Sequence, residues 1–192
     1  MTTMMEAVKT ETTTHQPSKT PSRAPSQTME PMLQEFRDEA AITRRVLDRV
    51  PADKLSWTPH PRSMTLGQLA MHLASIPGSL SKLAQLNEFD VAQAKFVPAQ
   101  PSDLREIQST LDEGVRCADE YLAGMSEREA SGTWRLLLNG REISRQPRVG
   151  MIRTIMFNHW YHHRGQLSVY LRLLNVPVPV IYGPSADESP FA

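Results

Sequence analysis

The chain has 192 residues, a length that fits one folded domain with an appended tail. Its 21 basic and 21 acidic residues leave no formal net charge, so we expect neither a nucleic acid nor an anionic membrane surface as a partner. No apolar run approaches the roughly 20 residues that span a bilayer, no signal-peptide pattern stands at the N-terminus and the chain has 1 cysteine, which together predict a cytoplasmic protein.

Residues 1–29 are rich in Thr, Ser, Pro and Gln and contain few apolar residues beyond scattered Met. Such a segment cannot bury enough apolar surface to offset the entropy that is lost when a chain becomes ordered. We therefore expect a disordered tail over residues 1–29, which includes His15, and a folded domain over residues 30–192.

The first two helices are predicted from helical spacing of apolar residues. One runs from Met32 to Val50, and the connector after it carries His60 between two prolines, where we expect an exposed loop histidine. The second helix begins after Thr65, because Thr65-Leu66-Gly67-Gln68 matches a capping box. His72 lies on its apolar stripe, and Pro77 further along predicts a kink or break.

A long linker precedes the third helix. Residues 87–101 show no sustained helical period, and a linker of that length could run back along a bundle, so the second and third helices could be parallel neighbours. Ser102 is suited to the N-cap and Asp103 to the first turn of a third helix that runs to about Met125. Cys117 lies within this helix, and we interpret it as a packing residue rather than a nucleophile.

The last third of the chain contains a hairpin signal and a long helix. The stretch Thr133–Ile143 contains Asn139-Gly140, a two-residue hairpin signal that predicts a short hairpin, although residues 136–138 could instead form a stray helical turn. The fourth helix begins near Pro147 and runs to about Leu174, with Asn175 suited to ending it. Residues 176–192 contain several prolines but also apolar side chains, so we expect an extended segment that lies against the bundle.

Half of the six histidines fall in this fourth helix, at His159, His162 and His163. Side chains three and four residues apart share a helical face, so His159 could act with either of the other two. Apolar residues at the same spacing turn this face toward the core, where a divalent metal would satisfy the imidazoles. Two ligands from one turn do not close a site, and His72 is the remaining histidine on an apolar stripe. A lone His72 would more often be a hydrogen-bonded core histidine, but together with the cluster it predicts a metal site.

Four amphipathic helices without a strong sheet pattern predict an all-α four-helix bundle, a fold that places metal sites between facing helices. Several stretches match a known family. They are Trp57-Thr58-Pro59, Thr65–Leu69 followed by His72, Asn158-His159 followed by His162–Leu167, and Tyr182–Glu188. Together these stretches resemble the DinB/YfiT-like superfamily from about residue 31 to the end of the chain.

The resemblance implies an up-down-down-up bundle that is often a homodimer and acts on a small-molecule substrate. It also implies one divalent metal ion, Zn, Ni or Fe, held by His72, His159 and His163, which leaves His162 beside the site or at the surface. Characterised relatives include transferases and isomerases that use bacillithiol, mycothiol or glutathione.

Three protein ligands leave a position of the metal open, and a low-molecular-weight thiol bound there becomes a thiolate. The leading hypothesis is therefore a metal-dependent S-transferase. The alternative is a metal-dependent hydrolase, which needs a general base to activate water. The Glu that serves as this base in the His-Glu-x-x-His motif of zincins is replaced by Trp160. Asp187 or Glu188 could act as the base only if the end of the chain folds over the site. The third hypothesis is a metal-binding module without turnover.

Overall fold

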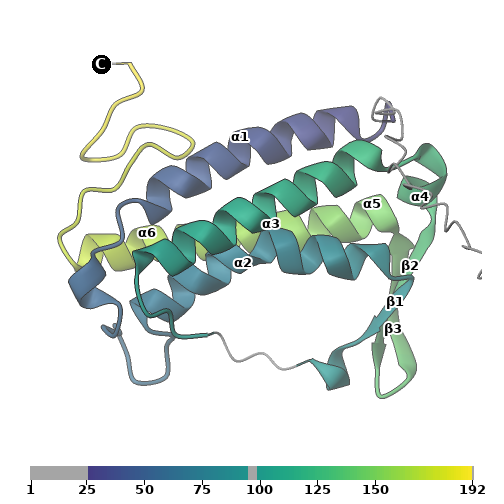
Figure 1. Ribbon diagram of the computed structural model, residues 1–192, viewed down its shortest axis with the longest axis horizontal. Helices are drawn as coiled ribbons and strands as arrows, with labels where there is room; N and C mark the ends of the chain where they lie inside the picture. The colour runs from purple at the N-terminus through teal and green to yellow at the C-terminus, as the bar shows by residue number, and fades with distance from the viewer. Residues whose placement is uncertain (1–25, 95–98, 192) are drawn as a thin grey trace, which may run out of the picture.

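A computed structural model describes residues 26–94 and 99–191 of the protein. Four long helical segments lie side by side and form a bundle (Figure 1). They are α1 (Glu30–Leu47), α2 (Leu66–Gln85), α3 (Leu104–Gly124) and a last segment that begins with α5 (Arg148–Met151), continues through a π-helical stretch (Ile152–Phe157) and ends with α6 (Asn158–Leu173). The predicted four-helix bundle is confirmed, and no helix among the described residues is long and apolar enough to cross a membrane.

The predicted tail over residues 1–29 overlaps the described residues only at positions 26–29. The predicted disorder of residues 1–25 and the position of His15 lie outside the described residues. Residues 26–29, which were assigned to the same tail, form a turn in which the Met29 amide donates to the Ser26 carbonyl. Met29 is fully buried in the core, because α1 needs an apolar residue to cover its first turn.

The direction of the helices is up, down, down, up, since α2 and α3 run the same way while α1 and α6 run the other way (Figure 1). The predicted parallel pairing of the second and third helices is confirmed by contacts along their length. Gly78 and Gly114 let the two backbones approach so closely that a Cβ atom on Gly78 would lie 3.0 Å from the Gly114 Cα. Further along, the Tyr121 hydroxyl donates to the Ala84 carbonyl at 3.0 Å.

Local signals at the helix ends are largely confirmed. Thr65 Oγ1 accepts from the Gln68 amide at 3.1 Å, and Gln68 Oε1 accepts from the Thr65 amide at 3.0 Å, which completes the predicted capping box. The N-cap of α3 is Asp103 and not Ser102, because the Asp103 carboxylate accepts from the Glu106 amide at 3.0 Å. Both residue types can cap a helix, so sequence alone placed this start one residue early.

A small sheet stands at one end of the bundle. The predicted hairpin is confirmed as β2 (Thr133–Leu138) and β3 (Arg141–Pro147), with Asn139 at φ 51° and Gly140 at φ 75° in its turn. The linker that was expected to be irregular contributes a third strand, β1 (Glu88–Asp90), which pairs in parallel with β2. Asp90 joins the two parts, because its carboxylate accepts from the amides of Asn139 at 3.0 Å and Gly140 at 2.7 Å.

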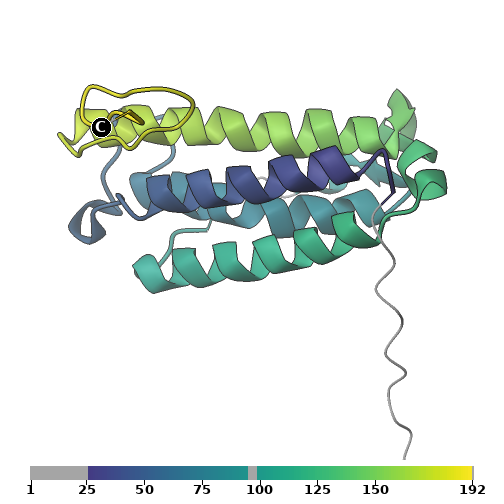
Figure 2. The same cartoon turned by 90° about the horizontal axis from the view of Figure 1, so that it is seen from above.

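The chain end lies over one end of α6, as Figure 2 shows. Asn175 ends the helix at φ 57°, and Val178 is buried, so the expected packing of this segment against the bundle is confirmed. Asp187 pairs with Arg172 at 2.5 Å and accepts from the Val178 amide at 2.8 Å. Glu188 pairs with Arg49, so both carboxylates hold the segment in place.

Candidate metal centre

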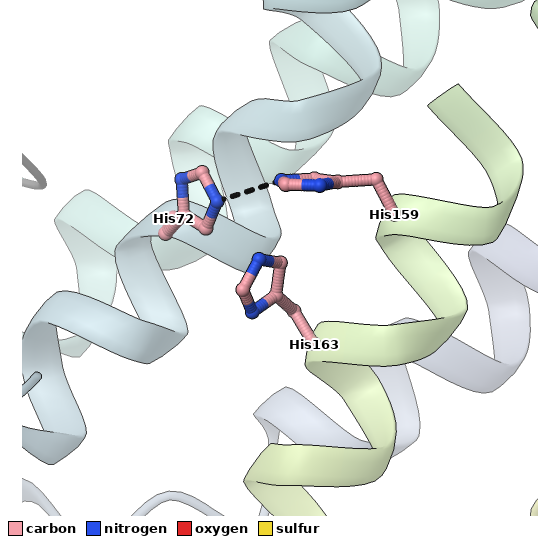
Figure 3. A group of neighbouring side chains, drawn as sticks. All are labelled: His72, His159 and His163. Carbon is pink, nitrogen blue, oxygen red and sulfur yellow. Dashed lines mark hydrogen bonds between the residues drawn. The ribbon is translucent and has the colours of Figure 1, made fainter. Parts of the chain in front are cut away.

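Three histidine side chains from two helices point toward one another (Figure 3). The Nε2 atoms of His72 on α2 and His159 on α6 lie 3.0 Å apart. The ring centroid of His163 lies 4.5 Å from that of His72 and 4.4 Å from that of His159. One nitrogen from each ring falls within 4.8 Å of the other two. Two nitrogen ligands of one tetrahedral Zn²⁺ stand roughly 3.3 Å apart, so this spacing fits a donor set for a single ion.

The structure decides between the two pairs that periodicity left open. His163 is 8% exposed and shares the buried face of α6 with Trp160 and Leu167. His162 is exposed and is not part of the three-nitrogen group. His60 is an exposed loop residue, as expected, and lies outside the group as well. The three histidines that the sequence analysis proposed as ligands are therefore the three that the fold brings together.

The protonation of these rings suits metal binding. Burial, together with the neighbouring His163 and His159, lowers the pKa of His72 to about 4. Burial lowers the pKa of His159 to about 4 as well, together with the charges of His163 and His162, and it also lowers the pKa of His163. All three imidazoles are neutral at pH ~7, so each can offer a nitrogen lone pair to a cation.

Gln166 fixes the orientation of one ring. Its Oε1 atom lies 2.6 Å from His163 Nδ1, one helical turn along α6. An amide oxygen can only accept a hydrogen bond, so the Nδ1 atom carries the proton and Nε2 keeps the lone pair that faces the cluster. Hydrogen bonds of this kind hold metal-ligating histidines in one tautomer and one orientation. No role was predicted for Gln166 from the sequence. Its position three residues after His163 is the feature that would have indicated a contact between the two side chains.

A hydrogen bond between α2 and α6 sets the two helices in register beside the cluster. Pro77 has no amide hydrogen, so the carbonyl of Leu73, four residues earlier, lacks its usual helical donor. The indole Nε1 of Trp160 donates to that carbonyl at 3.0 Å within the core. Leu73 follows His72 and Trp160 follows His159, so this bond fixes the two helices where the two rings meet. The expected break at Pro77 does not occur, since α2 continues through it from Leu66 to Gln85.

The helix that carries two of the histidines departs from regular α-helix just before them. Residues Ile152–Phe157 are π-helical, whereas the sequence pattern predicted one continuous α-helix. A π-helical stretch adds a residue to the turn and therefore changes which side chains face inward after it. Such stretches often occur at functional sites, and this one ends at the residue before Asn158.

The carboxylates that α1 directs toward the last helix are all paired. Arg164, 1% exposed, forms an ion pair with Glu39 at 2.5 Å and also donates to the Glu39 carbonyl and to Thr43. Glu35 pairs with Arg153 at 2.5 Å. These pairs hold α1 against α6, and neither carboxylate is free to act as a base at the cluster.

A cavity of about 800 Å³ lies beside the histidine cluster. His72 and His159 form part of its wall and His163 does not, so the cavity meets the cluster on the side of the first two rings. Its volume falls in the range of about 300–1,000 Å³ that is typical of small-molecule sites. The other described lining residues are mainly apolar: Met64, Met71, Ser75, Ile76, Ser79, Leu80, Leu83, Phe89, Val91, Ala99, Trp134, Leu136 and Ile155.

Comparisons with known proteins agree with this architecture. The model of the DinB family matches residues 25–190. The uncharacterized protein YrdA of Bacillus subtilis (strain 168) is 25% identical over 162 residues, which cover 84% of this chain and 92% of YrdA. The crystal structure of a DinB-like protein from Bacillus cereus ATCC 10987 superposes with a TM-score of 0.62 at 23% identity, covering 80% of this chain and 97% of that one. A DinB-like protein from Bacillus subtilis superposes with a TM-score of 0.60 at 16% identity, covering 79% of this chain and 97% of that one, so both share the fold.

Proposed function

The chain belongs to the DinB family, and from that premise we propose that it is a metal-dependent S-transferase that activates a low-molecular-weight thiol. The observation that supports this function is the convergence of three imidazoles, from His72, His159 and His163, beside an apolar cavity whose wall includes His72 and His159. Zn, Ni or Fe in the divalent state suits such a donor set. A bound ion with three protein ligands would keep a position at which a thiol is held as its thiolate.

In this proposal the histidines bind the metal ion, Gln166 orients one of them, and the cavity binds the substrate. The neutral rings of His72 and His159 can bind a cation without first losing a proton, and Gln166 keeps His163 in the tautomer that exposes Nε2. The cavity would hold the electrophile and exclude water from it. In the conjugation, the thiol sulfur forms a bond to the electrophilic carbon, the thiol proton passes to solvent, and the leaving group departs with the electrons of its bond.

The surroundings of the cluster favour thiol transfer over hydrolysis. A hydrolase that activates water usually places a general base beside it, and no carboxylate lies among the described residues that line the cavity. Asp187 and Glu188, the candidates from the sequence, are occupied in holding the C-terminal segment. A divalent ion held by the three histidines would lower the pKa of a thiol ligand without help from a protein base. Besides the ion and the thiol, the transferase would then need only the ligands and the cavity that the described part of the chain provides.

The test combines metal analysis with a conjugation assay. The protein purified without added metal should contain about one divalent ion per chain, and it should conjugate bacillithiol, mycothiol or glutathione to chlorodinitrobenzene. His159→Ala should lose the metal and the conjugation together. The matched control is His162→Ala, which removes the exposed histidine three residues later and should change neither.

Other outcomes would separate the remaining hypotheses. Conjugation that is unchanged in His159→Ala would remove the histidine cluster from the mechanism. Turnover of an ester or amide without any thiol would favour the hydrolase, and a bound metal without turnover of either kind would favour a binding module. The homodimer implied by the family and the cytoplasmic location stay predictions, and sedimentation equilibrium measures the first.

A further inference from the structure

The wall of the cavity beside the histidine cluster is mainly apolar. Met71, Ile76 and Leu80 reach it from α2, and Phe89 and Leu136 reach it from the sheet. The third strand β1, which brings Phe89 into the wall, is held to the hairpin turn through Asp90. The cavity is therefore a built feature of the fold, lined by α2, the last helical segment and the sheet at the end of the bundle.

Charge is absent from the described part of this wall. Apart from His72 and His159, the polar lining residues are Ser75 and Ser79, and the Ser75 hydroxyl already donates to the His72 carbonyl at 2.9 Å. A carboxylate, sulfonate or phosphate that entered would lose its hydration and meet no cationic partner among these residues.

We propose that the molecule taken into this cavity is an uncharged, apolar electrophile that carries a leaving group, such as an aryl or alkyl halide, with its reacting carbon toward His72 and His159. The assignment as an electrophile rests on the proposed transferase function. The preference for an uncharged apolar molecule rests on the wall alone. Any charged part of the thiol would lie outside the apolar wall, because nothing described there pairs with it.

Two fluorescent probes test the preference without any turnover. N-phenylnaphthylamine and anilinonaphthalene sulfonate share one ring system, and only the second carries a charge. The wall residues are tested alone in the metal-free full-length protein, since a bound divalent ion would itself attract the sulfonate. This protein should bind the neutral probe at one site per chain, with an affinity about tenfold or more above that for the sulfonate. The same preference should be found in His159→Ala, so it can be measured even if the proposed function fails.

Matched substitutions locate the binding. Leu136→Lys places a cation in the wall and should shift the ratio of the two affinities toward the sulfonate by about tenfold. Leu138→Lys is the control, because Leu138 lies two residues along the same strand, is 45% exposed and does not line the cavity. Ser79→Lys gives a second wall variant at an exposed helical position that should tolerate lysine without unfolding.

Three results would overturn the proposal. They are equal affinity of the metal-free wild-type protein for both probes, a ratio that neither wall variant changes, and a shift in Leu138→Lys as large as in Leu136→Lys. In a protein that conjugates chlorodinitrobenzene, a carboxylate-bearing analogue should react with a kcat/KM lower by about tenfold or more. Selective binding of the neutral probe without any conjugation would count against the transferase alone.

Discussion

The hydrogen bond from Trp160 to the Leu73 carbonyl offers the most direct test of how the two metal-binding helices are held together. Trp160→Phe keeps an aromatic ring in a fully buried position but removes the indole N–H. The carbonyl cannot turn to its usual helical donor, because that donor would be the amide of Pro77. It is therefore left buried without the partner that it has in the wild-type protein.

The expected cost follows from these contacts. A buried acceptor that loses its donor destabilises a protein by about 1–3 kcal/mol. The smaller ring also leaves a void, which adds on the order of 1 kcal/mol. The free energy of unfolding should therefore fall by roughly 2–4 kcal/mol, out of a total of about 5–15 kcal/mol for an ordinary domain. The melting temperature should drop by roughly 4 °C or more.

A double-mutant cycle in urea separates the lost hydrogen bond from the lost volume. Pro77→Ala supplies an amide hydrogen that can bond to the Leu73 carbonyl, so in that background Trp160→Phe should cost about 1 kcal/mol less than in the wild type. The volume lost is the same in both backgrounds and cancels. Effects that add within about 0.3–0.5 kcal/mol would refute the idea that the indole replaces the donor that proline lacks.

Two further predictions concern the histidines themselves. Gln166→Leu removes the acceptor that fixes His163, so metal affinity measured by competition with a chelator should fall by about 10- to 100-fold; an unchanged affinity would show that the hydrogen bond does not orient the ring. The metal-free protein should lose stability as the pH falls from about 7 to about 5. Burial is the main reason that the pKa values of His72 and His159 are lowered from 6.5 to about 4 in the folded protein. Between these pH values the unfolded chain therefore binds more protons than the folded one, which favours unfolding. Urea unfolding at both pH values after chelator treatment checks this, and equal stability would contradict it.

The sequence by itself determined the features that depend on neighbours along the chain. The period of apolar residues gave four helices, because one face of each must be buried. Thr65 and Gln68 gave the start of α2, and Asn139-Gly140 gave the hairpin turn, since each depends on hydrogen bonds or dihedral angles within a few residues. The inward position of His72 followed from its place on an apolar stripe, and the family resemblance selected His159 and His163.

Only the tertiary structure decided the features that join distant segments. Strand β1 spans three residues, too few for a pattern, and exists because it pairs with β2, whose paired residues lie 47 positions later. The donor to the Leu73 carbonyl comes from a residue 87 positions away. The cavity wall draws on α2, the sheet and the π-helical stretch together. The period of apolar residues tells which way a side chain faces on its own element, but what it meets there depends on how the elements pack. That packing placed an apolar cavity against the rings of His72 and His159.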